Sequence, residues 1–586
     1  MSPVDEPAQP PAEAARLLAE IAVLLELHEA DPFRARAFAA AARALEGTEA
    51  DLGALARSGE LATLPGIGAG IASVLRELVL TGRSRMHEEL VAATPVGLFD
   101  LMRLPGLGTK RIRLLHEQLG IDSLDSLEEA AREGRIAMLS GFGLKTQEKL
   151  LDGIAFARAV RSRRLFPQAV EVARRLAEGL RARGEVVEAE VAGAVRRCLE
   201  VVDRIDLVAS STEPEETRAA FASFNGVSEA SVGADGVLEG RLSDGLPVRL
   251  RCVAPAAFAA ALLWETGSDD HLRDLREHAA AAGMELGAEG LRSGGRKVAT
   301  KDEAALYRRV GLQYLPPELR EGLGEVGLAA AGKVPALVTL EQLRGTFHCH
   351  TTASDGKSTL REMAEGAAAR GWEYLGIADH SRTAAYAGGL SIDALRAQRV
   401  EIARLNGARG AGGVRLFAGT ESDVLIDGSL DYPPEVLAEL DYVVASVHSA
   451  FRISEEAMTA RLVAAVRNPH LTILGHPTGR LLLRREGYAV DLEAVVGAAA
   501  EAGVVIEINA HPNRLDLDWR EVRRAAARGV LIAIDPDAHS ADALDHVAYG
   551  VNVARKAGLE PRQILNCWPL EEVEAYLAER KQAGPA

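Results

Sequence analysis

The chain has 586 residues, 84 of them acidic and 67 basic, and a formal net charge of −17. Its length predicts several domains, and 48% hydrophobic residues without any apolar run of membrane-spanning length indicate a globular protein with no membrane partner. Four cysteines without a CxxC spacing exclude a disulfide framework or zinc finger, and the N-terminus lacks a signal-peptide pattern, so we expect a cytoplasmic protein. The acidic balance argues against a simple basic DNA-coating protein, so nucleic-acid binding must be local.

Residues 12–60 carry apolar side chains at helical spacing, which predicts amphipathic helices. A Leu-Pro-Gly-x-Gly turn then occurs twice, in LATLPGIGAGIASVL (61–75) and LMRLPGLGTKRIRLL (101–115), with a weaker third copy in MLSGFGLKTQEKLL (138–151). Such a turn opens a helix whose first N–H groups lack partners and can bind phosphate, although one copy alone would suit an ordinary helix end. The tandem copies resemble helix-hairpin-helix DNA binders. The resemblance implies phosphate contacts at Gly66, Gly68, Gly106, Gly108, Thr109, Lys110, Gly141 and Gly143.

The middle of the chain mixes helices and strands. We expect a helix over 168–186, strands around 186–191, 202–209 and 247–253, and helices again over 256–285. Residues 316–345 have turn residues and no strong period, which indicates a linker with short helices.

After residue 346, short apolar strands alternate with helices, a pattern typical of a parallel sheet or barrel. Residues just past the strand ends carry function in such folds. Here those positions hold imidazoles and carboxylates, namely His348, His350, Asp355, His380, Glu421, His448, His476, Asp537 and His539. Any one of them alone would suit a buried, hydrogen-bonded side chain.

The set of nine residues predicts a metal centre. His348 and His350 are two residues apart and so face the same side of a strand, and Asp537 and His539 repeat that spacing. Imidazole with carboxylate suits Zn, Mn or Fe(II) better than Mg, and nine ligands are too many for one tetrahedral ion. We therefore expect two or three divalent metal ions, which can activate water for attack on phosphorus.

Residues 346–586 resemble the PHP (polymerase and histidinol phosphatase) domain, and all nine ligand positions of the family pattern are filled. The resemblance implies a distorted (β/α)7 barrel with a trinuclear metal site. HPTGRLLLRREGY and EINAHPNRLDL are similar to the branch fused to DNA polymerases, which implies 3′–5′ exonuclease activity with related AP endonuclease and 3′-phosphatase activity. Arg382, Arg480 and Arg514 are candidate phosphate contacts in the catalytic site, with salt bridges as the alternative.

The chain as a whole resembles a bacterial X-family DNA polymerase with a nucleotidyltransferase palm and thumb. The palm departs from the family, because only Asp206 remains of three catalytic carboxylates, while Arg204, Arg249 and Ala194 occupy other key positions. Two guanidiniums beside one carboxylate would repel Mg²⁺, so we expect Asp206 to pair with Arg204 or Arg249 and polymerisation to be weak or lost. The alternative is that Asp203 rotates into the site and gives weak polymerisation. We expect Mg or Mn in the palm only if the polymerase is active. The first lysine is Lys110, with Val74 at the family's lysine position, so lyase chemistry is not expected in residues 1–85.

These observations predict a multidomain α/β protein. The domains are a helical helix-hairpin-helix domain (1–85), a fingers-like domain with the second such motif (86–160), a degenerate palm (161–255), a thumb-like domain (256–320), a linker (321–345) and the PHP domain (346–586). We expect a monomeric DNA-repair exonuclease that acts on DNA with gaps, nicks or 3′ ends. The alternatives are a gap-filling DNA polymerase, a small-molecule phosphatase of the histidinol-phosphatase type, and a non-catalytic DNA-binding scaffold.

Overall fold

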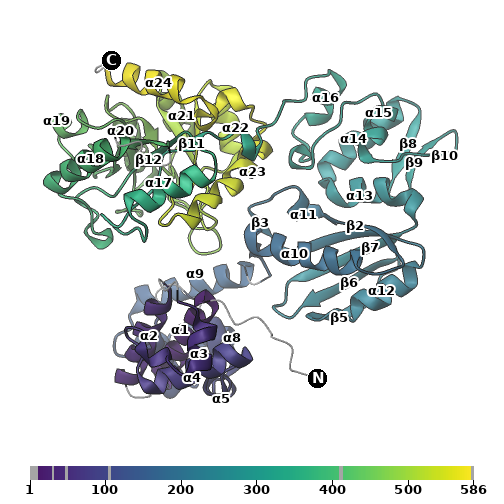
Figure 1. The fold of residues 1–586 in the computed structure, drawn as a ribbon. Coiled ribbons are helices and arrows are strands. Elements are labelled where there is room, and N and C mark those ends of the chain that lie inside the picture. Colours follow the sequence, from purple (N-terminus) through teal and green to yellow (C-terminus); the bar gives the residue numbers. More distant parts are fainter. Residues whose placement is uncertain are drawn as a thin grey trace. The chain divides into compact units, whose positions relative to one another are not determined.

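The computed structural model describes residues 11–28, 32–46, 50–102, 104, 107–160, 162–407 and 413–582. The chain forms two compact units, Met1–Arg161 and Ser162–Ala586, which are described separately (Figure 1).

The first unit is built of helices, as the apolar spacing predicted. They are α1 (Pro11–Leu27), α2 (Pro32–Glu46), α3 (Leu52–Ser58), α4 (Ala69–Thr81), α5 (Arg85–Ala93), α6 (Val96–Leu101), α7 (Thr109–Leu119), α8 (Leu124–Arg132) and α9 (Leu144–Val160), with 3₁₀ turns η1 (Leu61–Thr63) and η2 (Ile136–Met138). Leu18, Leu75 and Leu78 centre one apolar core, and Leu101, Ile112 and Leu115 belong to a second. Each core closes around one Leu-Pro-Gly-x-Gly repeat, so burial of helix faces holds the turns in place.

In the first part of the second unit, helix α10 (Phe166–Arg181) packs on a five-stranded sheet. The strand order is β2-β4-β7-β6-β5, and only the β4–β7 pair is parallel. The strands are β2 (Val186–Ala192), β4 (Ile205–Ser211), β5 (Val227–Val232), β6 (Val237–Leu242) and β7 (Pro247–Val253), joined by α11 (Gly193–Arg196) and α12 (Pro214–Ala222), while β1 (Arg164–Leu165) pairs with β3 (Val201–Val202). The strands predicted around 186–191 and 247–253 are confirmed as β2 and β7. β5 and β6 were not predicted, and β5 is a largely exposed strand without apolar alternation.

The strand predicted over 202–209 is broken. β3 ends at Val202 and β4 begins at Ile205, so Asp203 and Arg204 lie between strands. Strand alternation therefore does not set the direction of the Asp203 side chain. Asp203 is exposed in the connecting bend, whereas Asp206 is buried on β4.

The predicted helices of 256–285 are α13 (Phe258–Thr266) and α14 (Asp269–Ala281). A small antiparallel sheet follows, of β8 (Met284–Gly287), β9 (Gly290–Ser293) and β10 (Arg296–Val298), and then α15 (Glu303–Arg309). Residues 316–345 contain short helices as predicted, namely η4 (Pro317–Leu319), α16 (Glu325–Ala330) and η5 (Leu340–Gln342).

The remaining strands form two parallel sheets with helices around them (Figure 1). One contains β11 (Gly345–Thr346), β12 (Tyr374–Ile377) and β13 (Arg415–Ala418), and the other β14 (Glu421–Asp423), β15 (Val444–Ser446), β16 (Ile473–Leu474), β17 (Val505–Asn509) and β18 (Ile532–Asp535). The helices are α17 (Leu360–Ala369), α18 (Ile392–Gly407), α19 (Pro434–Leu437), α20 (Glu455–Val466), α21 (Leu492–Ala502), α22 (Trp519–Ala527), α23 (Val547–Ala557) and α24 (Leu570–Gln582), with 3₁₀ turns η6 (Ala385–Ala387), η7 (Asp542–His546), η8 (Pro561–Gln563) and η9 (Leu565–Cys567). Isolated parallel bridges pair His380 with Glu421 and Cys349 with Ala538. The closed barrel stays a prediction.

All four cysteines are free, which agrees with the exclusion of a disulfide framework. Within the part of the chain that the structure describes, no helix has both the length and the apolar character needed to cross a bilayer.

Candidate metal centre and its surroundings

The nine predicted metal ligands lie together in the second unit. Eight of them form three groups whose ligand atoms lie within 4.8 Å of one another, namely His350, Asp355, His380 and His539; His348, His350 and Asp537; and His380, Glu421 and His448. The ninth, His476, places Nε2 3.0 Å from Oε1 of Glu421. The histidines lie in the segments that follow β11, β12, β15, β16 and β18. Parallel strands bring their C-terminal ends to one edge, so these segments meet there.

Glu421 is the centre of the cluster. Its Oε1 lies 3.3 Å from Nε2 of both His348 and His448, and its Oε2 lies 2.8 Å from Nδ1 of His380. Burial alone would raise the pKa of Glu421, but His448, His348 and His380 hold it well below its ordinary value. Glu421 therefore remains a carboxylate and can serve as a ligand.

The position of Glu421 differs from the prediction. The sequence suggested one strand ending at this residue, whereas Glu421 opens β14 and the preceding strand β13 ends at Ala418. Gly419 lies so close to Tyr442 that an added Cβ would approach its ring to 2.4 Å, and Thr420 donates to the carbonyl of Asp379 over 3.0 Å. These contacts interrupt the strand and turn the chain from one sheet into the other.

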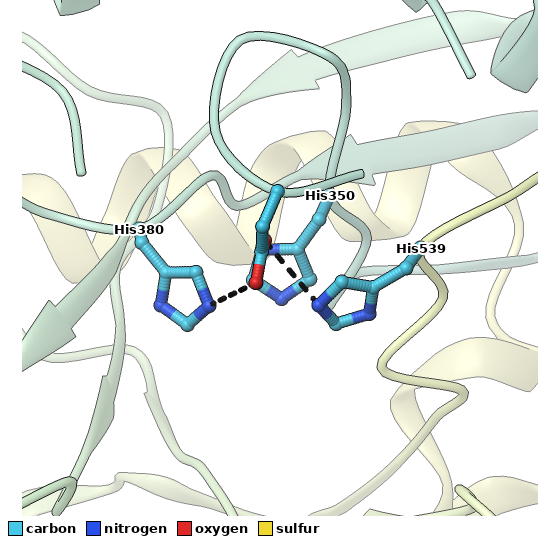
Figure 2. Close-up of side chains that lie close together, drawn as sticks. His350, His380 and His539 are labelled. Atoms are coloured by element: carbon cyan, nitrogen blue, oxygen red, sulfur yellow. Dashed lines mark ion pairs between the residues drawn. The ribbon is translucent and has the colours of Figure 1, made fainter. Parts of the chain in front are cut away.

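Asp355 joins the histidines at the more open side of the cluster. Its Oδ2 lies 3.6 Å from Nε2 of His380 and its Oδ1 lies 3.4 Å from Nε2 of His539, so the rings of His350, His380 and His539 gather around one space (Figure 2). The side chain of Asp355 is 36% exposed, whereas His348 and His350 are fully buried. Solvent and substrate can therefore reach the cluster from this side.

Buried imidazole nitrogens without hydrogen bonds show that the site fits metal ions. Both ring nitrogens of His350 lack a hydrogen-bond partner, although Nε2 lies 3.2 Å from Oδ1 of Asp537, and Nε2 of His348 and Nδ1 of His476 also lack one. A buried polar atom without a partner costs about 1–3 kcal/mol, so such atoms are rare without a function. Imidazole and carboxylate are together the ligands of Zn, Mn and Fe(II). The clusters therefore suggest metal binding.

Two carboxylates that the sequence analysis missed hold the histidine rings. Oε1 of Glu507 lies 2.6 Å from Nδ1 of His348, and Oδ1 of Asp423 lies 2.6 Å from Nδ1 of His448. Such pairs fix a ring so that Nε2 faces the metal side. Burial raises the pKa of Glu507 to about 7, although neighbouring His348 lowers it. A usable signal was present, because Glu507 is the one acidic residue in the apolar strand VVIEINA and Asp423 lies two residues after Glu421.

The three candidate arginines differ in their surroundings. Nε of Arg514 lies 3.5 Å from Oδ2 of Asp537, which places its guanidinium at the cluster. Arg382 is 55% exposed and donates to the carbonyl and carboxylate oxygens of Asp431 over 3.1 and 3.2 Å.

For Arg480 the salt-bridge alternative holds. Arg480 donates from Nε to the Arg514 carbonyl over 3.0 Å and from Nη1 to Asp518 over 3.2 Å, and Nη2 contacts Glu200 and the carbonyl of Leu515. Protein groups contact all three nitrogens of Arg480, which favours the salt-bridge alternative, while its role as a phosphate contact stays a prediction. Arg480 holds the loop that carries Arg514.

The palm remnant Asp206 is paired as predicted, and with both arginines. Its Oδ1 lies 2.8 Å from Nε of Arg204 and 3.5 Å from Nη1 of Arg249, and Asp206 and Arg249 are neighbours in the β4–β7 register. Asp206 is 3% exposed. Burial raises its pKa, although Arg204 and Arg249 lower it. Two guanidiniums therefore lie beside the Asp206 carboxylate.

Arg196 and Arg197 are neighbours in the sequence, and both form ion pairs within the protein. Arg196 forms a two-pronged ion pair with Glu303 over 2.9 and 2.7 Å, and Nε of Arg197 lies 2.9 Å from Glu321. Both guanidiniums are thus paired with carboxylates that follow the small β8–β10 sheet.

The glycine turns of the first unit keep helix N-termini open. Gly68 and Gly108 cap α4 and α7 without a side-chain hydrogen bond, and an added Cβ at either position would meet nothing within 4 Å. Gly66 and Gly141 have φ of 80° and 85°, the left-handed region that favours glycine. Gly143 precedes α9, Lys110 lies in the first turn of α7, and Gly106 lies outside the described residues.

Thr109 is the exception among the predicted DNA contacts. Its hydroxyl donates to Oε2 of Glu26 over 2.7 Å. Its side chain is therefore engaged with α1, and only its backbone N–H remains as a phosphate donor at this residue.

Known families match four parts of the chain. Residues 9–84 match a helix-hairpin-helix domain, 99–155 a SAM-like helix-hairpin-helix tandem, 261–321 the DNA polymerase beta thumb, and 346–511 the PHP domain. Helix-hairpin-helix and thumb domains indicate DNA binding. With the metal cluster, they define the class of X-family DNA polymerases that carry a PHP domain.

Relatives narrow this class to one family. The DNA polymerase/3'-5' exonuclease PolX of Bacillus subtilis (strain 168) is 36% identical to this chain over 567 residues, which cover 96% of the chain and 98% of that protein. The chain belongs to this PolX family. A probable phosphatase of Thermoanaerobacter sp. (strain X514) is 29% identical over 255 residues, which cover 40% of the chain and 94% of that protein.

Proposed function

We propose that this chain is a DNA-repair 3′–5′ exonuclease whose active site is the nine-ligand cluster of the PHP domain. The observation that carries the proposal is the convergence of nine imidazoles and carboxylates around buried ring nitrogens without hydrogen bonds. The name of the Bacillus subtilis relative, which matches over nearly its whole length, supports the same activity.

The three ligand groups suit two or three divalent ions of the Zn, Mn or Fe(II) type. Ions bound there would stabilise the negative charge that develops on phosphate oxygens during hydrolysis. Arg514 lies beside the cluster and would bind a non-bridging phosphate oxygen. Glu507 and Asp423 keep the histidine rings in one orientation, so that little reorganisation is needed when substrate binds.

The polymerase half would contribute binding rather than synthesis. Asp206, which would hold Mg²⁺, is paired with Arg204 and Arg249. Arg196, which would contact a triphosphate, is paired with Glu303. Polymerisation is therefore weak or lost, and Mg or Mn binds in the palm only if the activity remains. Residues 1–160 would bind gaps, nicks or 3′ ends of DNA through N–H groups at helix N-termini. The protein would be a monomer with the six domains proposed from the sequence.

The test is a 5′-labelled DNA with a recessed 3′ end, incubated in Mn²⁺ with and without dNTPs. We expect shortening in both conditions and its loss in His350→Ala. Intact DNA with the metal-loaded protein would refute the nuclease, whereas dNTP-dependent extension that Asp206→Ala abolishes would refute the degenerate palm. Oligonucleotides with an abasic site or a 3′-phosphate test for AP endonuclease and 3′-phosphatase activity.

A small-molecule phosphatase is the second candidate, because two probable phosphatases match 40% of the chain and 94% of their own length. It would share the metal cluster but would leave the glycine turns without a role. Histidinol phosphate and the recessed DNA are compared at equal enzyme concentration. A higher kcat/KM for histidinol phosphate would favour the phosphatase.

A further inference from the structure

An exposed tyrosine stands at the rim of the metal cluster. Tyr386 lies on η6 and is 72% exposed, yet its ring centroid lies 6.2 Å from that of His380 and 6.3 Å from that of His448. His380 and His448 belong to one ligand group with Glu421. The tyrosine ring thus meets two ligand rings while most of its surface faces solvent.

The segment that carries Tyr386 is anchored to the protein on both sides. Before it, Thr383 donates its N–H to Asp431 over 2.8 Å and its hydroxyl to Asp423 over 2.7 Å. After it, Gly389 lies so close to the Ser381 carbonyl that an added Cβ would approach its oxygen to 2.0 Å. These contacts fix the backbone next to the ligands and set where the ring stands.

Packing does not account for an aromatic residue here, because a side chain this exposed buries little apolar area. A flat, exposed ring beside a phosphate-hydrolysing site has the chemistry of a stacking platform for a nucleobase. We propose that Tyr386 stacks on the base of one of the two nucleotides that flank the scissile phosphate. This inference rests on the proposed exonuclease function and specifies its substrate class as nucleic-acid ends that carry bases, rather than small phosphate esters.

Stacking of this kind reads no particular sequence, since every base offers an aromatic face. The metal cluster and Arg514 bind phosphate, and Tyr386 supplies the contact that depends on a base. The site would therefore lose affinity for an abasic nucleotide at the stacked position and tolerate all four bases there.

The experiment uses the full-length Mn²⁺-loaded protein and single-stranded oligonucleotides. Tyr386→Ala should raise KM about 10- to 100-fold, whereas Tyr386→Phe, which keeps the ring, should stay within about twofold of the wild type. Val400→Ala is the matched control, because Val400 is 71% exposed on α18 in the same domain. Metal content and circular dichroism establish that each variant is folded and loaded.

A second set of oligonucleotides carries an abasic residue at the terminal or the penultimate position. At the stacked position, wild type and Tyr386→Ala should have equal KM, because the contact is already absent. Equal KM for both proteins on the base-carrying oligonucleotide would overturn the inference. If the wild type shortens no oligonucleotide, the proposed exonuclease function fails instead.

A binding readout separates stacking from catalysis. An oligonucleotide with 2-aminopurine at the stacked position and phosphorothioate linkages that resist cleavage is titrated with each protein. Quenching with the wild type and Tyr386→Phe but not with Tyr386→Ala supports the inference. Equal quenching by all three proteins contradicts it.

Discussion

At the scale of single residues, two members of the candidate metal centre are held in backbone conformations that non-glycine residues rarely adopt. His476 has φ of 23° and Asp537 has φ of 51°. Such conformations cost about 1–3 kcal/mol each and persist where the surroundings determine them. His476 donates its backbone N–H to Glu507 over 2.5 Å, so the carboxylate that orients His348 also fixes this backbone.

Glu507→Gln should weaken metal binding about 10- to 100-fold, because an amide supports the ligating histidine less well than a carboxylate. The affinity is measured by competition with a chelator of known metal affinity. Glu501→Gln, an exposed position near the end of α21, should leave it unchanged. Equal metal affinities of Glu507→Gln and wild type would show that Glu507 only fills the core.

Arg514 and Arg382 can be compared as a pair. Arg514→Ala should lower kcat/KM for DNA about 10- to 100-fold, the size expected for one hydrogen bond to a charged phosphate. Arg382→Ala should change it by less than about threefold, because Arg382 is half exposed and bound to Asp431 rather than to a ligand. The reverse order of effects would move the phosphate site to Arg382.

At the scale of secondary structure elements, the sequence identified the repeats because their chemistry is local. A Leu-Pro-Gly-x-Gly turn needs glycine for its backbone conformation, and the following apolar spacing specifies the helix. The interrupted strands were harder to predict. The breaks at 203–204 and 419–420 depend on contacts with distant segments, such as that of Gly419 with Tyr442.

Gly66→Ala should lower the free energy of unfolding of the first unit by about 1–2 kcal/mol, because φ at Gly66 is 80°. Gly70→Ala is the control within the same motif, since Gly70 lies in α4 and an added Cβ meets nothing within 4 Å. That variant should be about 1 kcal/mol more stable than wild type. Thermal unfolding of residues 1–161, followed within the full chain, measures the stability change caused by each variant. Equal stability changes for Gly66→Ala and Gly70→Ala would contradict the left-handed turn at Gly66.

At the scale of the whole molecule, the polymerase-like half of the second unit is tied to the metal-site half through buried charges. Lys556 on α23 is fully buried, pairs with Glu321, donates to the carbonyl of Arg197 over 3.1 Å, and lies 4.8 Å from the ring of Trp519. Glu321 also pairs with Arg197. One carboxylate thus joins Arg197, which follows α11, to Lys556 on α23.

Glu321→Gln should lower the free energy of unfolding by about 3 kcal/mol, because it leaves two buried cations without their carboxylate. Urea unfolding followed by tryptophan fluorescence is suited to this test, since Trp519 lies at the junction. Glu439→Gln, which affects an ion pair at the surface with Arg396 and Arg399, should leave the midpoint unchanged. Equal midpoints for Glu321→Gln and wild type would show that the two halves are not coupled through this network.

The sequence by itself determined the helix-hairpin-helix repeats, the β-α alternation and the nine imidazoles and carboxylates of the candidate metal centre, because each depends on residue type at short spacing. Charge alone predicted that Asp206 pairs with an arginine. The β4–β7 register brings Arg249 beside it, so that Asp206 has both Arg204 and Arg249 as partners. Tertiary structure decided what depends on distant neighbours. It placed Arg514 beside the cluster, engaged Arg480 with protein oxygens, brought Glu507 to His348, and left Tyr386 exposed beside His380 and His448. A side chain's partners are set by which strands lie side by side, and no local pattern specifies that.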